Sequence, residues 1–416
     1  MKTASQIPRG YAYLLIGSNR LPLKPAVVMR GVGGFDHFIT SIVTGKDILA
    51  EKLRTNYPMH TTSQDKEDFR NATHCKLCNK WLGKDWMRDH NRLSGKYRQA
   101  LHNKCNLQLK QRKIIPCIFH NLKNYYCLLI MQKLEKLQDH KISVIPIRME
   151  MYISFSIRRK MEKVNVTLQF VDSFQFLNTA LQKLVENLYQ SKFIIMQNCI
   201  SLPHMDKLLK KGIYPYEYMP SFRKFEETQL PPRSAFYNSL TNDLITEAEY
   251  EHAQNVWKCF NIKNLGEYHD LYAKTDVILP ADVFENFRKF TQNFYHLYAA
   301  HMLTSPGLAW QASLKMTVVK LDLFKDVNMH LFIEKVIRGG VSMISHRHSE
   351  THHPQCPIYV SSKENLYITY LDANNLYGWS MSQPLPVRDF KWLSPEEISQ
   401  RQICQTPGNS AVGYIL

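Results

Sequence analysis

The stretch Tyr367-Ile-Thr-Tyr-Leu-Asp-Ala-Asn-Asn-Leu-Tyr-Gly378 decides the fold of the C-terminal part of this chain. Its first five residues are β-branched, aromatic or aliphatic, a composition that favours a strand. We therefore expect a β-strand over residues 367–371 that presents Asp372 at its end. Tyr377 follows five residues later, and the run continues as Trp379-Ser-Met-Ser-Gln-Pro-Leu-Pro386.

Before this stretch, strand-like and helix-like segments alternate along the chain, and this alternation predicts an α/β layered fold. Short apolar runs predict the strands, and apolar residues at helical spacing predict the helices. The expected strands are Tyr11–Ile16, Ile114–His120 and Val166–Phe170. The expected helices lie near Phe38–Leu53, after Asn178 or Thr179, after Thr246, whose Thr-x-x-Glu forms a capping box, and after Pro280.

The composition excludes several classes of protein. The chain has 416 residues and is 44% hydrophobic, enough for two or three folded domains, and this excludes a disordered chain. The longest apolar runs have about five residues, too few to cross a membrane. The N-terminus lacks the pattern of a secretory signal, so we expect an intracellular protein without a membrane partner.

Residues 75–105 contain two short-spaced pairs of metal-ligating residues, Cys75-x2-Cys78 and His102-x2-Cys105. In a reducing compartment such pairs indicate a metal site rather than disulfides. Three thiolates and one imidazole suit a tetrahedral structural Zn²⁺ ion.

Positive charge is concentrated around these pairs. The whole chain has a formal net charge of +17, and residues 75–113 contain eleven Lys and Arg but two Asp. A polyanion such as DNA is the simplest partner for such a surface. The side chains that we expect to contact DNA here are Arg88, Arg92, Lys96 and Arg98.

The Tyr367–Pro386 stretch resembles motif A of family B DNA polymerases, in the protein-primed branch found in mobile elements, viruses and plasmids. This resemblance implies a palm domain in which Asp372 holds Mg²⁺ over an incoming deoxynucleoside triphosphate. Tyr377 would lie under the sugar and exclude a 2′-hydroxyl. It also implies a DNA-directed DNA polymerase (a nucleotidyltransferase) of DNA replication, with a terminal priming protein as a further partner and a nuclear location.

Two earlier segments resemble the second and third motifs of the family's proofreading exonuclease. They are Phe119-His-Asn-Leu-Lys-Asn-Tyr-Tyr126, which includes Asn121, and Tyr272-Ala-Lys-Thr-Asp276. The resemblance implies a ribonuclease H-like domain in which Asp276 holds a metal and Tyr272 orients the attacking water. Arg338-Gly339-Gly340 resembles the linker that touches the template strand.

The chain also departs from the family pattern. Tyr126 stands where the second motif has Asp, and a phenol is a poor Mg²⁺ ligand near neutral pH. Residues 1–70 contain no Asp-x-Glu motif on a strand, and the family's later Lys-bearing helix and Asp-x-Asp strand are absent. We therefore expect a chain truncated at both ends that neither proofreads nor extends a primer.

The Cys/His segment resembles the zinc module of recombination endonuclease VII. There, Asp89, His90 and Asn106 would surround one catalytic divalent ion. The alternative is a structural zinc module that binds DNA without cleaving it. This alternative is favoured because the module is embedded in a larger, enzyme-like chain. Three functions thus remain open: a family B polymerase, a non-catalytic DNA-binding remnant, and an endonuclease.

The expected organisation has four parts. Residues 1–70 are the first piece of the exonuclease-type domain, and residues 71–113 are the inserted zinc module. Residues 114–300 complete the exonuclease-type domain. Residues 301–416 contain the linker and the start of the palm.

Overall fold

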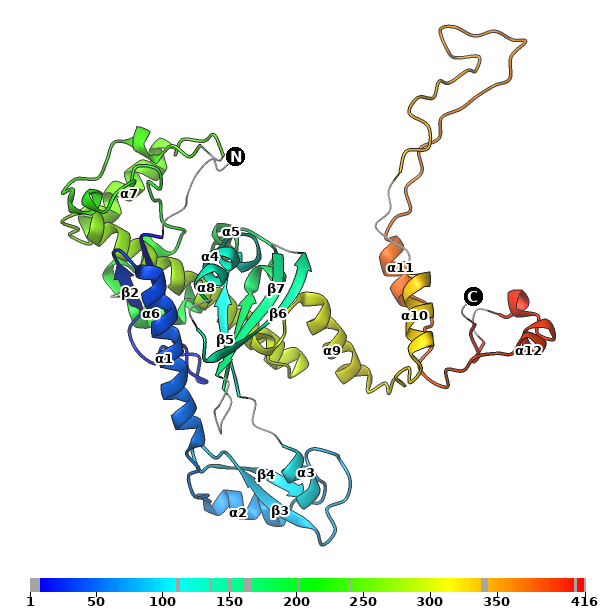
Figure 1. The fold of residues 1–416 in the computed structure, drawn as a ribbon, viewed down its shortest axis with the longest axis horizontal. Helices are drawn as coiled ribbons and strands as arrows, with labels where there is room; N and C mark the ends of the chain where they lie inside the picture. The colour runs from blue at the N-terminus through cyan, green and yellow to red at the C-terminus, as the bar shows by residue number, and fades with distance from the viewer. Residues whose placement is uncertain are drawn as a thin grey trace. The chain divides into compact units, whose positions relative to one another are not determined.

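The computed structural model describes residues 8–109, 113–134, 137–148, 151–159, 166–200, 202–239, 241–337, 343–407 and 410–414. The chain divides into two compact units, Met1–Ser313 and Leu314–Leu416, which are described separately below. The fold is mixed α/β, as the alternation of segments predicts (Figure 1).

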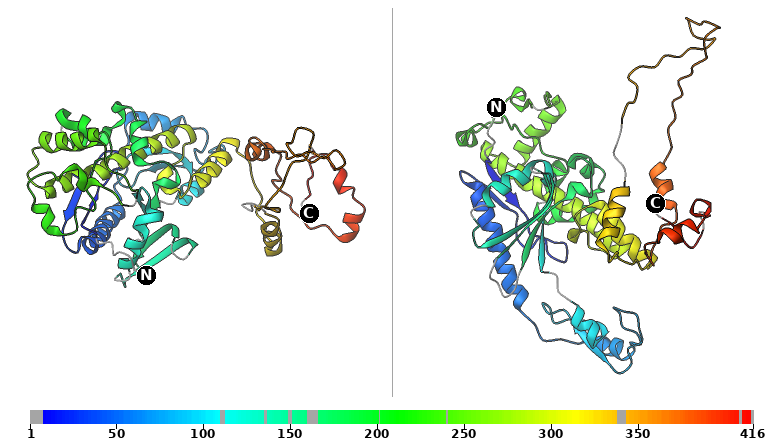
Figure 2. Two further views of the ribbon diagram at one scale, coloured as in Figure 1. Left: turned by 90° about the horizontal axis from the view of Figure 1, so that it is seen from above. Right: turned by 45° about the vertical axis from the view of Figure 1, so that its right-hand side comes forward.

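A four-stranded mixed sheet is the centre of the first unit. Its strands are β5 (Ile114–Phe119), β6 (His140–Arg148), β7 (Met151–Arg159) and β8 (Thr167–Asp172), in the order β5-β8-β7-β6. β5 and β8 are parallel, whereas β8–β7 and β7–β6 are antiparallel. Figure 2 shows this sheet from two further directions. The carboxyl ends of β5 and β8 therefore lie at the same edge.

Apolar side chains of β7 and β8 pack against two helices, α1 (Gly34–Arg54) and α4 (Cys127–Leu134). A π-helical turn, Leu122–Tyr126, precedes α4. The two-stranded sheet of β1 (Gly10–Tyr13) and β2 (Val27–Arg30) comes before α1. The buried members of this core are Phe38, Ile39, Leu122, Cys127, Ile130, Leu134, Phe155, Ile157, Leu168 and Phe170.

A second core is formed by helices that follow the sheet. They are α5 (Leu181–Glu186), α6 (Ile194–Cys199), α7 (Glu247–Cys259) and α8 (Leu265–Tyr295). Asp282 of α8 is buried and accepts hydrogen bonds from the backbone N–H groups of Ile195 and Met196, both at 2.8 Å. This contact fixes the first turn of α6 against α8.

The Cys/His segment has a small core of its own. α2 (Ser63–Arg70), β3 (Trp86–His90), β4 (Tyr97–His102) and α3 (Asn103–Gln108) surround Cys75, Leu82, Ala100 and Leu101. The ring of Phe69 stacks on Trp86 at 4.2 Å between centroids. We call residues 57–109 the Cys/His module.

The second unit contains α10 (Val327–Val336), α11 (Leu376–Ser382) and α12 (Pro395–Ser399), and α9 (Ser305–Thr317) crosses the boundary between the units. Its contacts include Trp392 Nε1, which donates to Asp326 Oδ2 at 2.7 Å.

Short 3₁₀ turns occur in both units. They span Ser173–Gln175, Gln190–Lys192, Leu202–Leu208, Phe222–Glu226, Arg233–Phe236, Ala299–His301 and Ile403–Gln405. Within the described ranges, none of the helices combines the length and the hydropathy of a membrane-spanning segment.

Most expected elements are present. β1, α1, β5 and β8 lie at the predicted segments, and the capping box of Thr246 and Glu249 begins α7. The helix expected from Asn178 or Thr179 begins later, at Leu181. The carbonyl of Thr179 instead accepts a hydrogen bond from His120 Nε2 at 3.1 Å.

The expectation that Pro280 begins a new helix is wrong. α8 runs without a break through Pro280 for 31 residues. Proline removes one backbone hydrogen bond and costs about 3 kcal/mol within a helix. Burial of Ile278, Leu279, Val283 and Phe284 on both sides of the proline offsets this cost.

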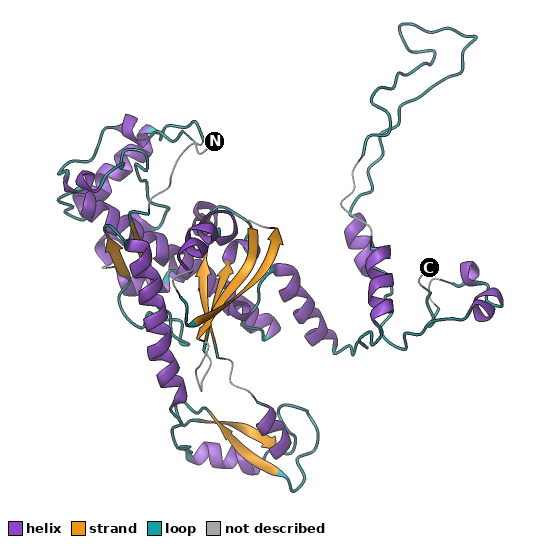
Figure 3. Cartoon of the chain, in the orientation of Figure 1, coloured by secondary structure: helices purple, strands orange, loops and turns teal. Residues whose placement is uncertain are grey.

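The expected strand over residues 367–371 is also absent. These residues are exposed loop, as Figure 3 shows between α10 and α11. The described part of the second unit supplies one isolated bridge, between His352 and Leu366, and no neighbouring strand. A strand needs a hydrogen-bonded partner, so composition alone does not form one here.

Candidate functional site

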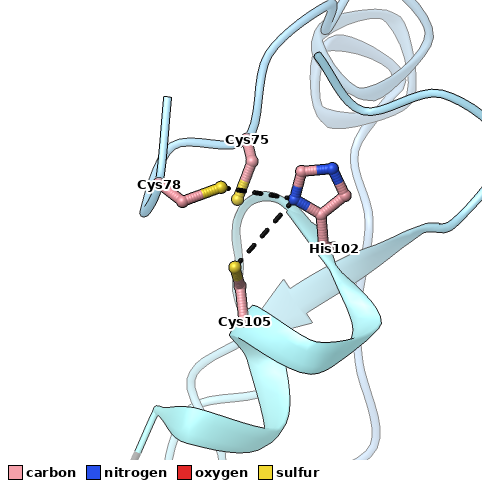
Figure 4. Close-up of side chains that lie close together, drawn as sticks. All are labelled: Cys75, Cys78, His102 and Cys105. Carbon is pink, nitrogen blue, oxygen red and sulfur yellow. Dashed lines mark hydrogen bonds between the residues drawn. The ribbon is translucent and has the colours of Figure 1, made fainter. Parts of the chain in front are cut away.

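The Cys/His module brings its four predicted metal ligands together. Cys75 and Cys78 lie in a tight turn in which Asn79 adopts a left-handed conformation with φ 58° and its N–H donates to the Cys75 carbonyl at 2.8 Å. β4 ends at His102, and the first turn of α3 places Cys105 beside it (Figure 4). The sequence spacing therefore predicted this cluster correctly.

The geometry of the cluster fits a zinc ion. The four ligand atoms lie within 4.8 Å of one another. His102 Nδ1 lies 3.4 Å from Cys78 Sγ and 3.9 Å from Cys105 Sγ. Zn–S bonds of about 2.3 Å and Zn–N bonds of about 2.0 Å in a tetrahedron separate S and N by about 3.5 Å. Among the described residues this is the one group of three or more such side chains that could hold a metal.

The module fixes the tautomer of His102. Its Nε2 donates to the Trp81 carbonyl at 2.9 Å, so Nδ1 is left to face the thiols. This backbone hydrogen bond is the main cause that raises the pKa of His102. A ligating histidine is commonly oriented in this way by a backbone carbonyl.

The thiols differ in how easily they ionise. Burial opposes ionisation of Cys75, but the backbone N–H groups of Cys78, His102 and Leu77 together lower its pKa to about 6. Burial and the neighbouring thiols raise the pKa of Cys105 to about 11. The first thiolate therefore forms readily, and a divalent cation would be needed to stabilise the others.

The four basic side chains that we expected to contact DNA have different environments. Arg92 and Lys96 are exposed in the turn between β3 and β4. The guanidinium carbon of Arg88 lies 4.3 Å from the centre of the Phe69 ring, and the residue as a whole is exposed. Arg98 donates to Asp89 Oδ1 at 2.8 Å, so its charge is balanced within the module.

The three residues of the endonuclease hypothesis have other contacts in this structure. Asp89 is buried and accepts from Arg98 and, at 3.3 Å, from Gln99 Nε2. Asn106 Nδ2 donates to Met87 Sδ at 3.1 Å. His90 lies at an irregularity in the β3–β4 pairing. Asp89 and Asn106 therefore form hydrogen bonds with different partner residues.

A second candidate site lies on α8. Tyr272 and Asp276 are one turn apart on the same side of this helix. The hydroxyl groups of Tyr272 and Tyr216 are hydrogen-bonded to each other, and the ring of Tyr214 stacks on Tyr272 at 4.8 Å. Tyr126 is near enough for its phenol to raise the pKa of Tyr272, although burial is the largest cause. We call these five residues the tyrosine cluster.

The charges of the tyrosine cluster do not fit a two-metal site. Burial raises the pKa of Asp276, and the ammonium of Lys211 opposes this shift. One carboxylate, an ammonium and several phenols are a poor ligand set for Mg²⁺, which prefers carboxylate oxygens. Lys211 was missed in the sequence because it lies 65 residues from Asp276 in the chain.

Asn121 lies at the carboxyl end of β5. It is left-handed, with φ 72°, and its backbone N–H donates to Asp172 Oδ1 at 2.8 Å. The N–H of Lys123 donates to the other oxygen of Asp172 at 2.9 Å. Asp172, at the end of β8, was also missed, and its position after an apolar strand was the available signal. Its carboxylate is buried and occupied by backbone donors, so it organises this edge of the sheet.

The remaining predicted residues belong to the second unit. Asp372 is exposed, and Tyr377 in the first turn of α11 is 84% exposed. The left-handed Asn375 precedes this helix. Arg338, Gly339 and Gly340 lie outside the described residues.

One of three comparisons with known proteins shows the family of this chain. No curated protein matches it. Among solved structures it is similar to phi29 DNA polymerase complexed with primer-template DNA and incoming nucleotide, at 15% identity and a TM-score of 0.30. That match covers 56% of this chain and 32% of the phi29 chain, so the chain spans about a third of that protein. The family model of type B DNA polymerases, organellar and viral, matches residues 105–414. The chain therefore belongs to the organellar and viral type B DNA polymerases.

Proposed function

We propose that this chain acts in DNA replication as a DNA-binding member of the protein-primed type B DNA polymerases, with DNA, deoxynucleoside triphosphates and a terminal priming protein as partners, and that it does not extend a primer by itself. The observation that supports this most directly is the family match, which extends from the last metal ligand, Cys105, to the residues beyond Asp372. The family activity is DNA-directed nucleotidyl transfer. A mobile element replicating in the nucleus is the setting that agrees with the resemblance of its motifs.

The sheet and the helices that follow it form, in this proposal, a ribonuclease H-like exonuclease-type domain. A mixed sheet with the parallel pair β5–β8 supports this assignment, because the second-motif segment follows β5 at the carboxyl edge. The third-motif residues Tyr272 and Asp276 belong to the same tyrosine cluster as Tyr126. We place the inserted zinc module at residues 71–113 and the start of the linker and palm at residue 301.

We further propose that the tyrosine cluster does not hydrolyse DNA. Phosphodiester hydrolysis by two metals requires several carboxylates to hold both ions. Here Tyr126 replaces one of them, and Lys211 already provides a positive charge near Asp276. The exposed ring of Tyr216 can instead stack on an unpaired base.

In this proposal the Cys/His module is a zinc-stabilised DNA-binding module rather than an endonuclease. Its exposed Arg92 and Lys96 lie together at one turn, and the ion pair with Arg98 occupies Asp89. Contacts to phosphates give affinity that is weakly dependent on sequence. Asn121, at the second-motif segment, and the Arg338–Gly340 segment would add contacts to single-stranded DNA.

The test of this function uses the full 416-residue chain with a fluorescent primer-template. We expect salt-sensitive binding, and simultaneous replacement of Arg88, Arg92, Lys96 and Arg98 by Ala should flatten the salt dependence. Strand cleavage that is lost on Asp89→Ala and His90→Ala would instead support the endonuclease. Absence of DNA binding at low salt would reject the DNA-binding role of this chain.

A further inference from the structure

A cavity of about 370 Å³ lies on a part of the first unit that the functions above do not use. It is lined by the loop that joins β1 to β2, by the end of α6 and by α8. Its polar lining residues are Asn19, Lys24, Asn198, Cys199 and Lys274, and the rest of the lining is apolar or proline. None of the lining residues that the structure describes is acidic.

The two lysines give the cavity a positive charge that is not balanced by an ion pair. The ammonium of Lys274 donates to the Cys199 carbonyl at 3.2 Å, which holds it at the wall. The ammonium of Lys24 lies 5.4 Å from the centre of the Tyr13 ring. Within the described ranges neither lysine forms a salt bridge. Both ammonium groups are therefore available to an anion that enters the cavity.

The loop that forms one wall is held in place by its own backbone. The N–H of Gly17 donates to the Leu21 carbonyl at 2.9 Å, and the N–H of Leu23 donates to the Leu15 carbonyl at 2.9 Å. Ile16 and Pro22 also form a bridge. Because the loop is already ordered, it loses less conformational entropy when a ligand binds.

The cavity is separate from the tyrosine cluster, although both use α8. Lys274 lies two residues from Tyr272 and two residues from Asp276. At 3.6 residues per turn, each step of two residues rotates the side chain by about 200°. Lys274 therefore points to the opposite side of α8.

We propose that this cavity binds a phosphoryl anion of mononucleotide size. The two lysines supply the charge, and the amide of Asn19, whose Oδ1 accepts from the Leu21 N–H, supplies a hydrogen-bond donor that phosphate oxygens need. Asn198 Nδ2 already donates to the Ile194 carbonyl at 2.7 Å and has one further N–H. The volume is in the range of small-ligand sites, and it is larger than a halide ion would require. A free nucleotide and a backbone phosphate of single-stranded DNA share this chemistry.

The thiol of Cys199 offers a direct test because it lines the cavity. The full chain is treated with a limiting amount of maleimide, and mass spectrometry measures labelling at Cys199 itself. An anion between the lysines should slow this labelling, since it covers the thiol and cancels the positive charge that favours the thiolate. The probes are dAMP and a short oligo(dT) at the same phosphate concentration, with sodium chloride at matched ionic strength as the control.

The variant Lys24→Glu reverses one charge at the exposed rim, and Lys289→Glu makes the same change at an exposed position on α8 outside the cavity. We expect protection of Cys199 in the wild type and in Lys289→Glu, and its loss in Lys24→Glu. Lys274→Gln should weaken the protection as a second variant, with Tm measured for each protein. Protection by dAMP identifies a nucleotide site, and protection by oligo(dT) alone identifies a DNA backbone phosphate. No protection by either probe, or protection that persists in Lys24→Glu, overturns the proposal.

Discussion

Arg98 and Asp89 form an ion pair of 2.8 Å in which the carboxylate is buried and the guanidinium is half exposed. This pair joins neighbouring positions of β3 and β4, and Gln99 donates to the same carboxylate. The ion pair neutralises Arg98, one of the four basic side chains expected to contact DNA. It also engages Asp89, one of the three residues of the endonuclease hypothesis. The remaining exposed charges at the β3–β4 turn, Arg92 and Lys96, therefore carry most of the expected contact with DNA.

Replacing Arg92 and Lys96 together by Ala should reduce the salt dependence of DNA binding. Each lost phosphate contact reduces the magnitude of the negative slope of log K against log[salt] by about 0.9. The slope of the double variant should therefore be smaller in magnitude by about 1.8. Fluorescence anisotropy between low and moderate salt measures this slope. Lys258→Ala with Lys289→Ala, on exposed faces of α7 and α8, is the matched control. An unchanged slope in the Arg92 and Lys96 variant would show that other residues make the main contact with DNA.

Replacing Cys78 by Ser should remove zinc from the protein. The cluster then keeps only three of its four ligands, and a structural site with three ligands binds zinc far more weakly. Elemental analysis should fall from about one zinc per chain towards zero, with a lower Tm for the module. Cys356→Ser, outside the cluster, should keep its zinc. Equal zinc content in both variants would contradict the assignment.

The chain should show no metal-dependent 3′–5′ exonuclease activity. The tyrosine cluster has one carboxylate, Asp276, and its charge is opposed by Lys211. Incubation of a labelled single strand with Mg²⁺ or Mn²⁺ should leave its end intact in both the wild type and Asp276→Ala. Degradation that disappears in Asp276→Ala would show that another group completes the site.

The chain should also fail to extend a primer by itself. Two-metal transfer needs more than one carboxylate, and in the described residues the one group of three or more side chains that could hold a metal is the Cys/His cluster. A primer-extension assay with Mg²⁺ or Mn²⁺ checks this prediction. Incorporation that is lost on Asp372→Asn would mean that a second carboxylate, such as Asp389 or Glu396, joins Asp372 on DNA.

Stability should fall in acid because of His269. Burial, followed by the charge of Arg30, lowers the pKa of His269 to about 4, whereas an unfolded histidine titrates near 6.5. Between these values the unfolded chain binds the extra proton, so the free energy of unfolding decreases as the pH falls from 6.5 to 4. The slope is at most about 1.4 kcal/mol per pH unit.

The variant His269→Asn keeps an acceptor for the Tyr214 hydroxyl, which lies 2.8 Å from His269 Nδ1. It removes the titrating group, so its urea unfolding should depend less on pH in this window than that of the wild type. His348→Asn, at an exposed histidine, should behave like the wild type. If all three proteins show the same pH dependence, the neutral state of His269 does not contribute.

Local patterns predicted much of this fold. The capping box at Thr246 and the apolar runs of β5 and β8 were sufficient, because their signals are contained in a few neighbouring residues. The Cys/His cluster was predicted for the same reason, since each pair spans four residues.

Features that depend on distant contacts were not predicted. Pro280 remains inside α8 because buried residues on both sides stabilise the helix, and no local rule includes that packing. The Tyr367–Leu371 segment has strand-like composition, but in the described residues it has no neighbouring strand. Lys211 affects Asp276 only after the chain has folded.

The separate core of the Cys/His module has a consequence for how this polymerase family can diversify. Cys75, Leu82, Ala100 and Leu101 are buried with one another, and none belongs to the cores of the sheet or of α8. A substitution in the module therefore needs no compensating substitution in the sheet. Buried side chains of the module can therefore change during evolution while the sheet and the helices packed on α8 keep their own cores.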